Sequence, residues 1–145
     1  MLIKIIVVGK LKDSALASKC ETYLKRLRAY GKVELVELPD SNVAKEAQAV
    51  LKELERDRVR CFWVLTEEGQ EFTSHQLSEK LSACDRKLVF LIGGPYGIAP
   101  EVKAASDCLW SLSKLTFPHE IARLLLCEQL YRAANLASGG SYHHD

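Results

Sequence analysis

The sequence lacks the marks of membrane and of secreted proteins. Its most apolar stretch, residues 1–9, is far shorter than the roughly 20 residues that a membrane-spanning helix needs. No cleavage-site pattern follows that stretch, so it is not a signal peptide. The five cysteines form no C-x-x-C pair, which argues against a redox or zinc motif. We therefore expect a cytoplasmic protein with no membrane partner, whose cysteines are reduced and buried.

Two nucleotide-binding fingerprints are also missing. The glycine-rich stretch at residues 93–97 is not G-x-G-x-x-G, and no P-loop lysine follows it. A Rossmann-type oxidoreductase would need the first pattern and a suitable acidic partner. A triphosphate-binding enzyme would need the second. Both classes are therefore disfavoured.

Net charge is small, at +1 for the chain, and alone neither supports nor excludes a nucleic-acid partner. Its distribution is uneven. Residues 1–32 have eight basic and two acidic side chains, a net charge of +6, whereas the remainder has twelve basic and seventeen acidic ones, a net charge of −5. The basic segment is either a surface that meets phosphate or the solvated face of a helix. Composition alone favours the second interpretation.

An apolar share of 48% in 145 residues is enough for a buried core. No repeat or long linker interrupts the chain, so we expect one domain spanning residues 1–145. Hydrophobic periodicity predicts strands at residues 2–9, 33–38, 61–66, 87–92 and 108–112. It predicts helices at residues 14–27, 42–57, 74–84, 100–105 and 118–137, with Asn42 as an N-cap and Pro118 near a first turn.

This alternation of strands and helices is typical of an α/β protein whose sheet has helices on both faces. Ligands of such sheets bind beyond the carboxyl ends of the strands. The loops after the third, fourth and fifth strands are therefore where we expect functional residues.

Two of these loops have a composition suited to ligand binding. Residues 93–100 contain three glycines and two prolines, which would let the backbone approach an adenine or ribose edge, or would only form a strand-to-helix turn. Residues 110–119 pass through several Ser and Thr residues before a proline. They would close a cofactor pocket, or serve only as a helix entry. His119 and Arg123 are four residues apart and would share a helix face.

The chain continues past its last helix with two glycines and the sequence S-Y-H-H-D. Terminal segments are commonly disordered. A Tyr142–His143 pair on a glycine hinge is also suited to stack on a base and to transfer a proton. Adjacent residues rarely chelate one ion in good geometry, so His143, His144 and Asp145 are not expected to bind a metal.

Several motifs together carry a family resemblance. They are L-I-G-G-P-Y-G at residues 91–97, L-S-K-L-T-F-P-H at 112–119, Arg123, E-Q-L-Y-R-A at 128–133 and the terminal Tyr142–His143. With I-V-V-G-K-L-K at 6–12, V-E-L-P-D at 36–40 and E-E-G at 67–69, the sequence resembles the ribosomal RNA large-subunit methyltransferase H family of SPOUT enzymes from end to end.

The resemblance implies an α/β domain with a SPOUT-type parallel sheet and a carboxyl-terminal trefoil knot, an exception to the rule that chains avoid knots. It implies a homodimer that binds S-adenosylmethionine and methylates N3 of a pseudouridine in 23S ribosomal RNA, within the ribosome or the large subunit. It also favours the basic segment as a surface that faces RNA.

Site residues follow from the same resemblance. The implied cofactor contacts are Leu65, Gly93, Leu112, Ser113, Lys114, Leu115, Thr116 and Phe117. The residues expected to act on the base are Tyr142, His143, His119 and Arg123. Arg123 would stabilise negative charge on the base carbonyls, and Tyr142 with His143 would stack on the base or remove its proton.

Two positions depart from the family pattern. Tyr96 stands where an acidic or small polar residue would be unsurprising, which bears on loop shape, and His144 stands where the family often has Arg or Lys, which bears on RNA affinity. The alternatives are a SPOUT methyltransferase for transfer RNA or another ribosomal site, and an RNA- and cofactor-binding module without activity. The target depends on surface shape that one sequence does not reveal.

Overall fold

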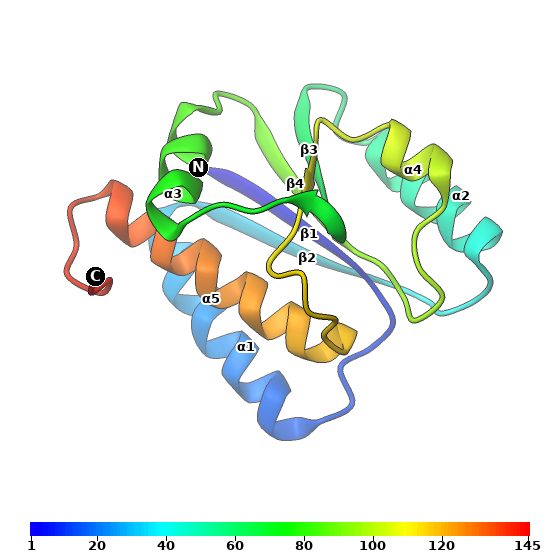
Figure 1. The fold of residues 1–145 in the computed structure, drawn as a ribbon, viewed down its shortest axis with the longest axis horizontal. Helices are drawn as coiled ribbons and strands as arrows, with labels where there is room; N and C mark the ends of the chain where they lie inside the picture. Colours follow the sequence, from blue (N-terminus) through cyan, green and yellow to red (C-terminus); the bar gives the residue numbers. More distant parts are fainter.

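The computed structural model describes residues 1–145, and its strands and helices alternate along the chain (Figure 1). In chain order they are β1 Leu2–Val8, α1 Ser14–Leu27, the 3₁₀ turn η1 Arg28–Tyr30, β2 Lys32–Leu38, α2 Val43–Leu54, β3 Arg60–Gln70, α3 Ser74–Ala83, β4 Lys87–Ile92, α4 Pro100–Ala104, β5 Cys108–Trp110 and α5 His119–Ala137. The predicted α/β class is confirmed.

All five strands belong to one parallel sheet in the order β2-β1-β4-β3-β5. Ile5 in the middle of β1 lies between Leu35 of β2 and Phe90 of β4. The central strands β1 and β4 are apolar along almost their whole length, as expected for parallel strands that are covered on both faces.

Helices cover both faces of the sheet (Figure 1). On one face α5 packs between α1 and α3, over alternate residues of the central strands such as Ile5 and Phe90. On the other face α2 and α4 pack over the intervening residues, such as Ile6 and Val89. This arrangement follows from the two-residue period of a strand, which sends successive side chains to opposite faces.

Side chains cap three of the helices at their amino ends. Asp13 accepts from the first turn of α1, and Asn42 accepts from the backbone N–H of Lys45 at 2.8 Å, which confirms the predicted N-cap. Thr73 and Gln76 form a reciprocal capping box on α3. Pro118 immediately precedes α5, as expected from its fixed φ angle.

Three boundaries differ from the predicted ones by two or more residues. Strand β5 ends at Trp110 rather than at 112; its last pair is Trp110 with Gln70, and the backbone N–H of Ser111 donates to the carbonyl of Gln70 at 2.8 Å. Strand β3 continues to Gln70, with an irregularity after Leu65 in its pairing with β5. Helix α2 ends at Leu54 rather than at 57, because the following residues form tighter, three-residue turns.

A buried charge cluster lies on the α2 side of β1. Nζ of Lys4, whose side chain is only 2% exposed, lies 2.6 Å from Glu53 and 2.9 Å from Asp57. Asp57 also accepts from Lys87 at 2.8 Å, so the cluster joins β1 and β4 to the end of α2. Burial alone would raise the pKa of Asp57, but the hydrogen bonds from Lys4 and Lys87 outweigh it and hold the pKa below its usual value.

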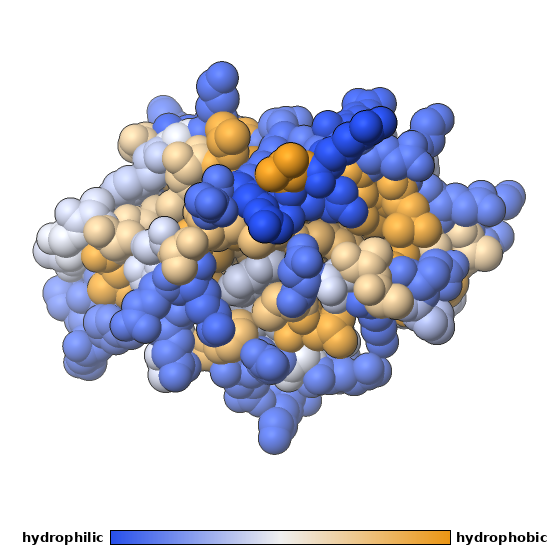
Figure 2. Space-filling view, turned by 90° about the horizontal axis from the view of Figure 1, so that it is seen from above, coloured by the Kyte–Doolittle hydropathy of each residue, from blue (hydrophilic) through white to orange (hydrophobic).

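The surface is largely hydrophilic on the face shown in Figure 2, where apolar residues gather in several separate patches. None of the helices is long and apolar enough to cross a membrane. All five cysteines are free thiols; Cys20 and Cys127 are buried, and the other three are half-buried. The prediction of buried cysteines is therefore met only at two positions.

Candidate cofactor and RNA site

A cavity of about 680 Å³ opens beyond the carboxyl ends of the last three strands. Its walls come from the irregular stretch of β3 at residues 65–68, from the loops after β4 and β5, and from the first turn of α5. Pockets that hold drug-sized ligands are typically of about this size, ~300–1,000 Å³. Seven of the eight residues predicted to contact the cofactor line it, namely Leu65, Gly93, Leu112, Ser113, Leu115, Thr116 and Phe117. Lys114 does not.

The glycine loop forms one wall and is closely packed behind. A β-carbon on Gly93 would lie 2.5 Å from Cγ1 of Ile98, so no larger residue fits without moving the loop. Gly97 has a φ of 90° and donates its N–H to the carbonyl of Gly94, which closes a tight turn. The side chain of Tyr96 is 75% exposed in that turn.

The opposite wall, residues 112–117, keeps most of its backbone donors free. Within this stretch only Leu115 donates its backbone N–H to a protein acceptor, Oγ of Ser113 at 3.0 Å. Ser111 fixes the start of the stretch through its Oγ, which donates to the carbonyl of Ser113 at 2.8 Å. Unpaired N–H groups at the edge of an apolar cavity suit a ligand with several acceptor atoms, such as adenine and an amino-acid carboxylate.

Two acidic residues stand at the mouth of the cavity, and sequence reasoning did not assign them there. Glu67 accepts from Oγ1 of Thr116 at 2.8 Å, and Glu68 lies 3.3 Å from Nζ of Lys103. Both follow the point where β3 departs from its pairing with β5. Two signals were available in the sequence: their position just after the strand end expected at residue 66, and the E-E-G motif of the family resemblance.

The structure places His119 at the cavity and Arg123 one helical turn behind it. His119 is half-buried and lines the wall. Arg123 is 8% exposed and does not line the cavity. Its Nη1 donates to Oε2 of Glu37 at 2.8 Å, and its Nε has no partner. In this chain, the guanidinium is therefore engaged by β2 rather than directed at a ligand.

Tyr142 and His143 lie at the far end of α5, away from the cavity of their own chain. The nineteen residues of α5 separate them from His119, about 28 Å of helix at 1.5 Å per residue. Tyr142 donates to Glu128 at 3.0 Å, and its ring packs on Tyr131 at 4.7 Å between centroids. The four residues expected to act on the base are thus not brought together within one chain.

The hydrogen-bond partners of Tyr142 and His143 indicate where each side chain carries its proton. Burial raises the pKa of Tyr142, and hydrogen bonds with Tyr23 and Glu128 raise it further, so its hydroxyl stays a donor. Nη1 of Arg132 lies 3.1 Å from Nδ1 of His143. A guanidinium only donates, so Nδ1 accepts, while Nε2 carries the proton and donates to Asp145 at 2.9 Å.

Basic and aromatic side chains alternate beside the tail, on α1 and α5. Lys19 and Arg26 lie 5.5 and 5.6 Å from the ring of Tyr23, and Arg26 also faces Tyr131 at 5.8 Å. Lys19 and Arg26 are exposed, whereas the two rings are half-buried. This combination of cations and ring faces is the one that RNA-binding surfaces use.

Comparison with known proteins decides the family. A family model described as "Predicted SPOUT methyltransferase" matches residues 1–143. The chain belongs to this SPOUT family. It is 41% identical over 152 residues to "Ribosomal RNA large subunit methyltransferase H" of Gloeobacter violaceus, with 99% of each chain covered. It is 44% identical over 142 residues to the protein of the same name from Synechococcus sp. (strain RCC307), covering 97% of this chain and 93% of the relative. These relatives confirm the resemblance.

Solved structures agree on the fold of this SPOUT protein. A probable methylase family protein from Haemophilus influenzae superposes with a TM-score of 0.61 at 14% identity, over 99% of this chain and 70% of the other. A tRNA (m1G37) methyltransferase from Aquifex aeolicus gives 0.56 at 15% identity, over 91% and 70%. At such identities the likeness concerns the fold alone, an α/β architecture shared with SPOUT enzymes.

Proposed function

We propose that this protein transfers a methyl group from S-adenosylmethionine to N3 of a pseudouridine in 23S ribosomal RNA. The observation that carries the proposal is the cavity, which gathers seven of the eight family-implied cofactor residues from three loops distant in sequence. The names of the curated relatives, ribosomal RNA large-subunit methyltransferases, supply the RNA class. The pseudouridine and its N3 come from the family resemblance.

The cavity fits S-adenosylmethionine in size and chemistry. Free backbone N–H groups of residues 112–117 would hold the adenine and the carboxylate, and the glycine loop would admit the ribose without a side chain in between. Glu67 would face the cationic part of the cofactor at the mouth. When bound, the cofactor supplies an electrophilic methyl group, and the protein's work is to align it with the acceptor.

On the acceptor side, His143 is the residue suited to take the imide proton of the base. Its Nδ1 carries no proton while Arg132 donates to it. If Arg132 turned to an RNA phosphate, Nδ1 would be free to accept, with Nε2–H held by Asp145. Tyr142 remains a neutral hydroxyl and contributes its ring and a hydrogen bond. His119 would lie beside the reacting groups, and Arg123 behind them.

A homodimer would bring these parts together. Tyr142 and His143 lie a helix length from their own cavity, so a second chain must place its tail beside it for the proposed chemistry. Ile121, Leu124 and Leu125 on α5 are half-buried and available for such an interface, whereas Leu130 is wholly in the core. The target nucleotide would then bind where the two chains meet.

We further propose that residues 1–145 form one catalytic domain with a carboxyl-terminal trefoil knot. The stretch between β5 and α5 lines one cavity together with residues 65–68 of β3 and the loop after β4, and Thr116 bonds to Glu67 across it. Helix α5 then packs between α1 and α3. Threading of the stretch before α5 through the other two segments would make the knot. The enzyme would work in the cytoplasm, where it meets ribosomes.

Mass-spectrometric nucleoside mapping tests the proposal. Ribosomes that lack the modification would be incubated with the protein and S-adenosylmethionine, and the 23S RNA digested and mapped. A new methyl on N3 of a 23S pseudouridine would support the enzyme, substrate and cofactor together. A methyl at another ribosomal site or on transfer RNA would support the alternative SPOUT target instead. Cofactor binding without methyl transfer to any RNA would point to an inactive binding module.

A further inference from the structure

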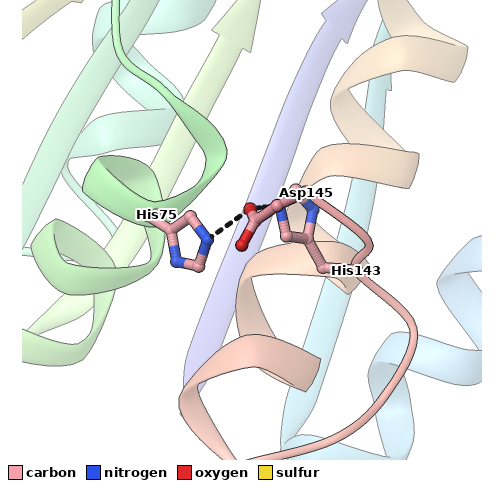
Figure 3. A group of neighbouring side chains, drawn as sticks. All are labelled: His75, His143 and Asp145. Carbon is pink, nitrogen blue, oxygen red and sulfur yellow. Dashed lines mark hydrogen bonds and ion pairs between the residues drawn. The ribbon is translucent and has the colours of Figure 1, made fainter.

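Helix α3 and the tail at residues 138–145 bring together three side chains, His75, His143 and Asp145. His75 and His143 each place Nε2 2.9 Å from Oδ1 of Asp145 (Figure 3). The two imidazole rings are edge to face, with centroids 4.9 Å apart. No two of the three donor atoms are more than 4.8 Å apart. Adjacent terminal residues alone were not expected to bind a metal. The third side chain, His75, comes from 70 positions away in the sequence and is not subject to that constraint.

We propose that His75, His143 and Asp145 form a binding site for a divalent transition metal, with Zn²⁺ as its natural occupant. Two imidazole nitrogens and one carboxylate oxygen are a zinc donor set that leaves a fourth position for water. In tetrahedral zinc sites with bonds near 2.0–2.2 Å, donor atoms lie roughly 3.3–3.5 Å apart. Here the two nitrogen–oxygen separations of 2.9 Å are slightly shorter than that range, and the upper limit of 4.8 Å for any pair is longer.

The exposure of the three side chains indicates which of them would move to bind the metal. His75 is 54% exposed at the start of α3, and Asp145 is 80% exposed on the tail, so both side chains are free to adjust. His143 is 14% exposed and is the anchored member. Oδ1 of Asp145 lies 2.9 Å from Nε2 of both imidazoles, so the carboxylate oxygen already faces the two nitrogens that would share the metal.

One neighbour opposes the metal. A zinc-bound Nε2 requires the proton of His143 to move to Nδ1, where Arg132 now donates at 3.1 Å. Binding therefore requires Nη1 of Arg132 to withdraw from His143, while its Nε and Nη2 stay bonded to Glu128. Arg132 thus weakens the site, and removing its charge should tighten metal binding.

Occupation would also regulate the proposed methyl transfer, and this consequence rests on the proposed function. A His143 ring bound through Nε2 with Nδ1 protonated has no nitrogen left to accept the imide proton. The tail would be fixed on α3 at the same time. Zinc should therefore inhibit methyl transfer without weakening binding in the cofactor cavity, which none of the three residues lines.

Metal titration of the full chain tests the site. The chelator-treated protein is titrated with Co²⁺, whose visible absorption reports tetrahedral nitrogen and oxygen ligands, and with Zn²⁺ against a chromophoric chelator. We expect one equivalent to bind, at least about tenfold more weakly in His75→Ala and Asp145→Asn. His144→Ala is the matched control and should bind within about twofold of the parent. Arg132→Gln should bind more tightly.

Three results would overturn the site. They are a metal affinity of His75→Ala equal to that of the parent, a loss of affinity in His144→Ala as large as the loss expected for His75→Ala, and thiolate charge-transfer bands that place the metal on cysteine. The first would mean that α3 takes no part in binding, and the second would mean that His144 is itself a ligand. Inhibition is measured separately. Zinc should inhibit the parent and spare His75→Ala, whose side chain has no part in methyl transfer. A protein that binds metal at this site but methylates no RNA would refute the proposed function and leave the metal site standing.

Discussion

Nη1 of Arg123 in α5 lies 2.8 Å from Oε2 of Glu37 near the end of β2, joining residues 86 positions apart. The guanidinium is nearly buried, whereas Glu37 is 38% exposed, and Nε of Arg123 has no other partner. The ion pair therefore ties the edge strand to the helix that begins at the cavity. A buried guanidinium without its carboxylate would be costly, because its lost hydration is not replaced.

Glu37→Ala should lower the free energy of unfolding by about 1–2 kcal/mol, discounted for the exposure of Glu37. Urea titration followed by circular dichroism measures it. Glu55→Ala, at an exposed glutamate just after α2, is the control and should change stability by less than about 0.5 kcal/mol. Equal stability of the two variants would mean that the Arg123–Glu37 contact contributes nothing net.

The buried cluster of Lys4, Glu53 and Asp57 predicts sensitivity to acid. The pKa of Asp57 in the folded state is held below its value of about 3.9 in the unfolded state. As the pH falls past that value, the unfolded state therefore takes up a proton before the folded state does, and the stability of the fold decreases. The stabilisation is complete well above pH 4 and is lost as the pH falls through the folded pKa.

Asp57→Asn should therefore be destabilised by about 3 kcal/mol at pH 7 and lose this part of the acid dependence. Urea titrations from pH 7 to pH 3 make the comparison. Asp85→Asn, at a carboxylate whose side chain is 95% exposed, should follow the parent throughout. An unchanged acid profile in Asp57→Asn would contradict the assigned role of the cluster.

Local signals in the sequence predicted most of the fold and one half of the candidate site. The buried central strands, the Asn42 cap and the glycine loop each depend on residues close together in the chain. The rule that ligands bind beyond the carboxyl ends of parallel strands then located the cavity. Composition marked the stretch at residues 110–119, whereas the family resemblance singled out Leu65 and the individual contacts within residues 112–117.

Long-range geometry accounts for the rest. Arg123 contacts Glu37, which is 86 positions away in the sequence, and Asp145 contacts His75, which is 70 positions away. Hydrophobic periodicity is a local signal and cannot predict such pairs. Motif spacing also could not show that Tyr142 and His143 lie a helix length from the cavity. Adjacency in a family motif says nothing about which chain of an assembly supplies a residue to a site.

Gly93→Ala should reduce the affinity for S-adenosylmethionine by about tenfold or more, since the new β-carbon would meet Ile98 and push the loop into the cavity. Isothermal titration calorimetry measures the affinity. Gly139→Ala, at a φ of 78° with open space around it, tests glycine loss away from the cavity and should leave the affinity unchanged. Adding Ile98→Ala to Gly93→Ala should restore part of the loss; no restoration would argue against this steric cause.

His143→Ala should lower the rate of methyl transfer by about 10²–10⁴-fold, the usual contribution of a general base, with cofactor affinity unchanged. Tyr142→Phe should cost much less, because its ring remains packed on Tyr131 and its hydroxyl is not the base. Single-turnover methylation of ribosomes and calorimetric cofactor titration provide the two readouts. Parallel losses of rate and cofactor affinity in His143→Ala would assign the residue to structure instead.

Lys19→Ala and Arg26→Ala should weaken binding to a 23S RNA stem-loop similarly across unrelated sequences, because exposed cations contact phosphate rather than bases. Each should reduce the slope of log affinity against log salt concentration by about one phosphate contact, roughly 0.7–0.9. Filter binding between about 50 and 200 mM salt gives that slope. Arg56→Ala removes an equal charge, 72% exposed and paired only with Glu53 at 3.7 Å, from the end of α2. If Arg56→Ala lowered the slope as much, RNA would be responding to net charge, and the surface formed by α1 and α5 would have no special part in binding.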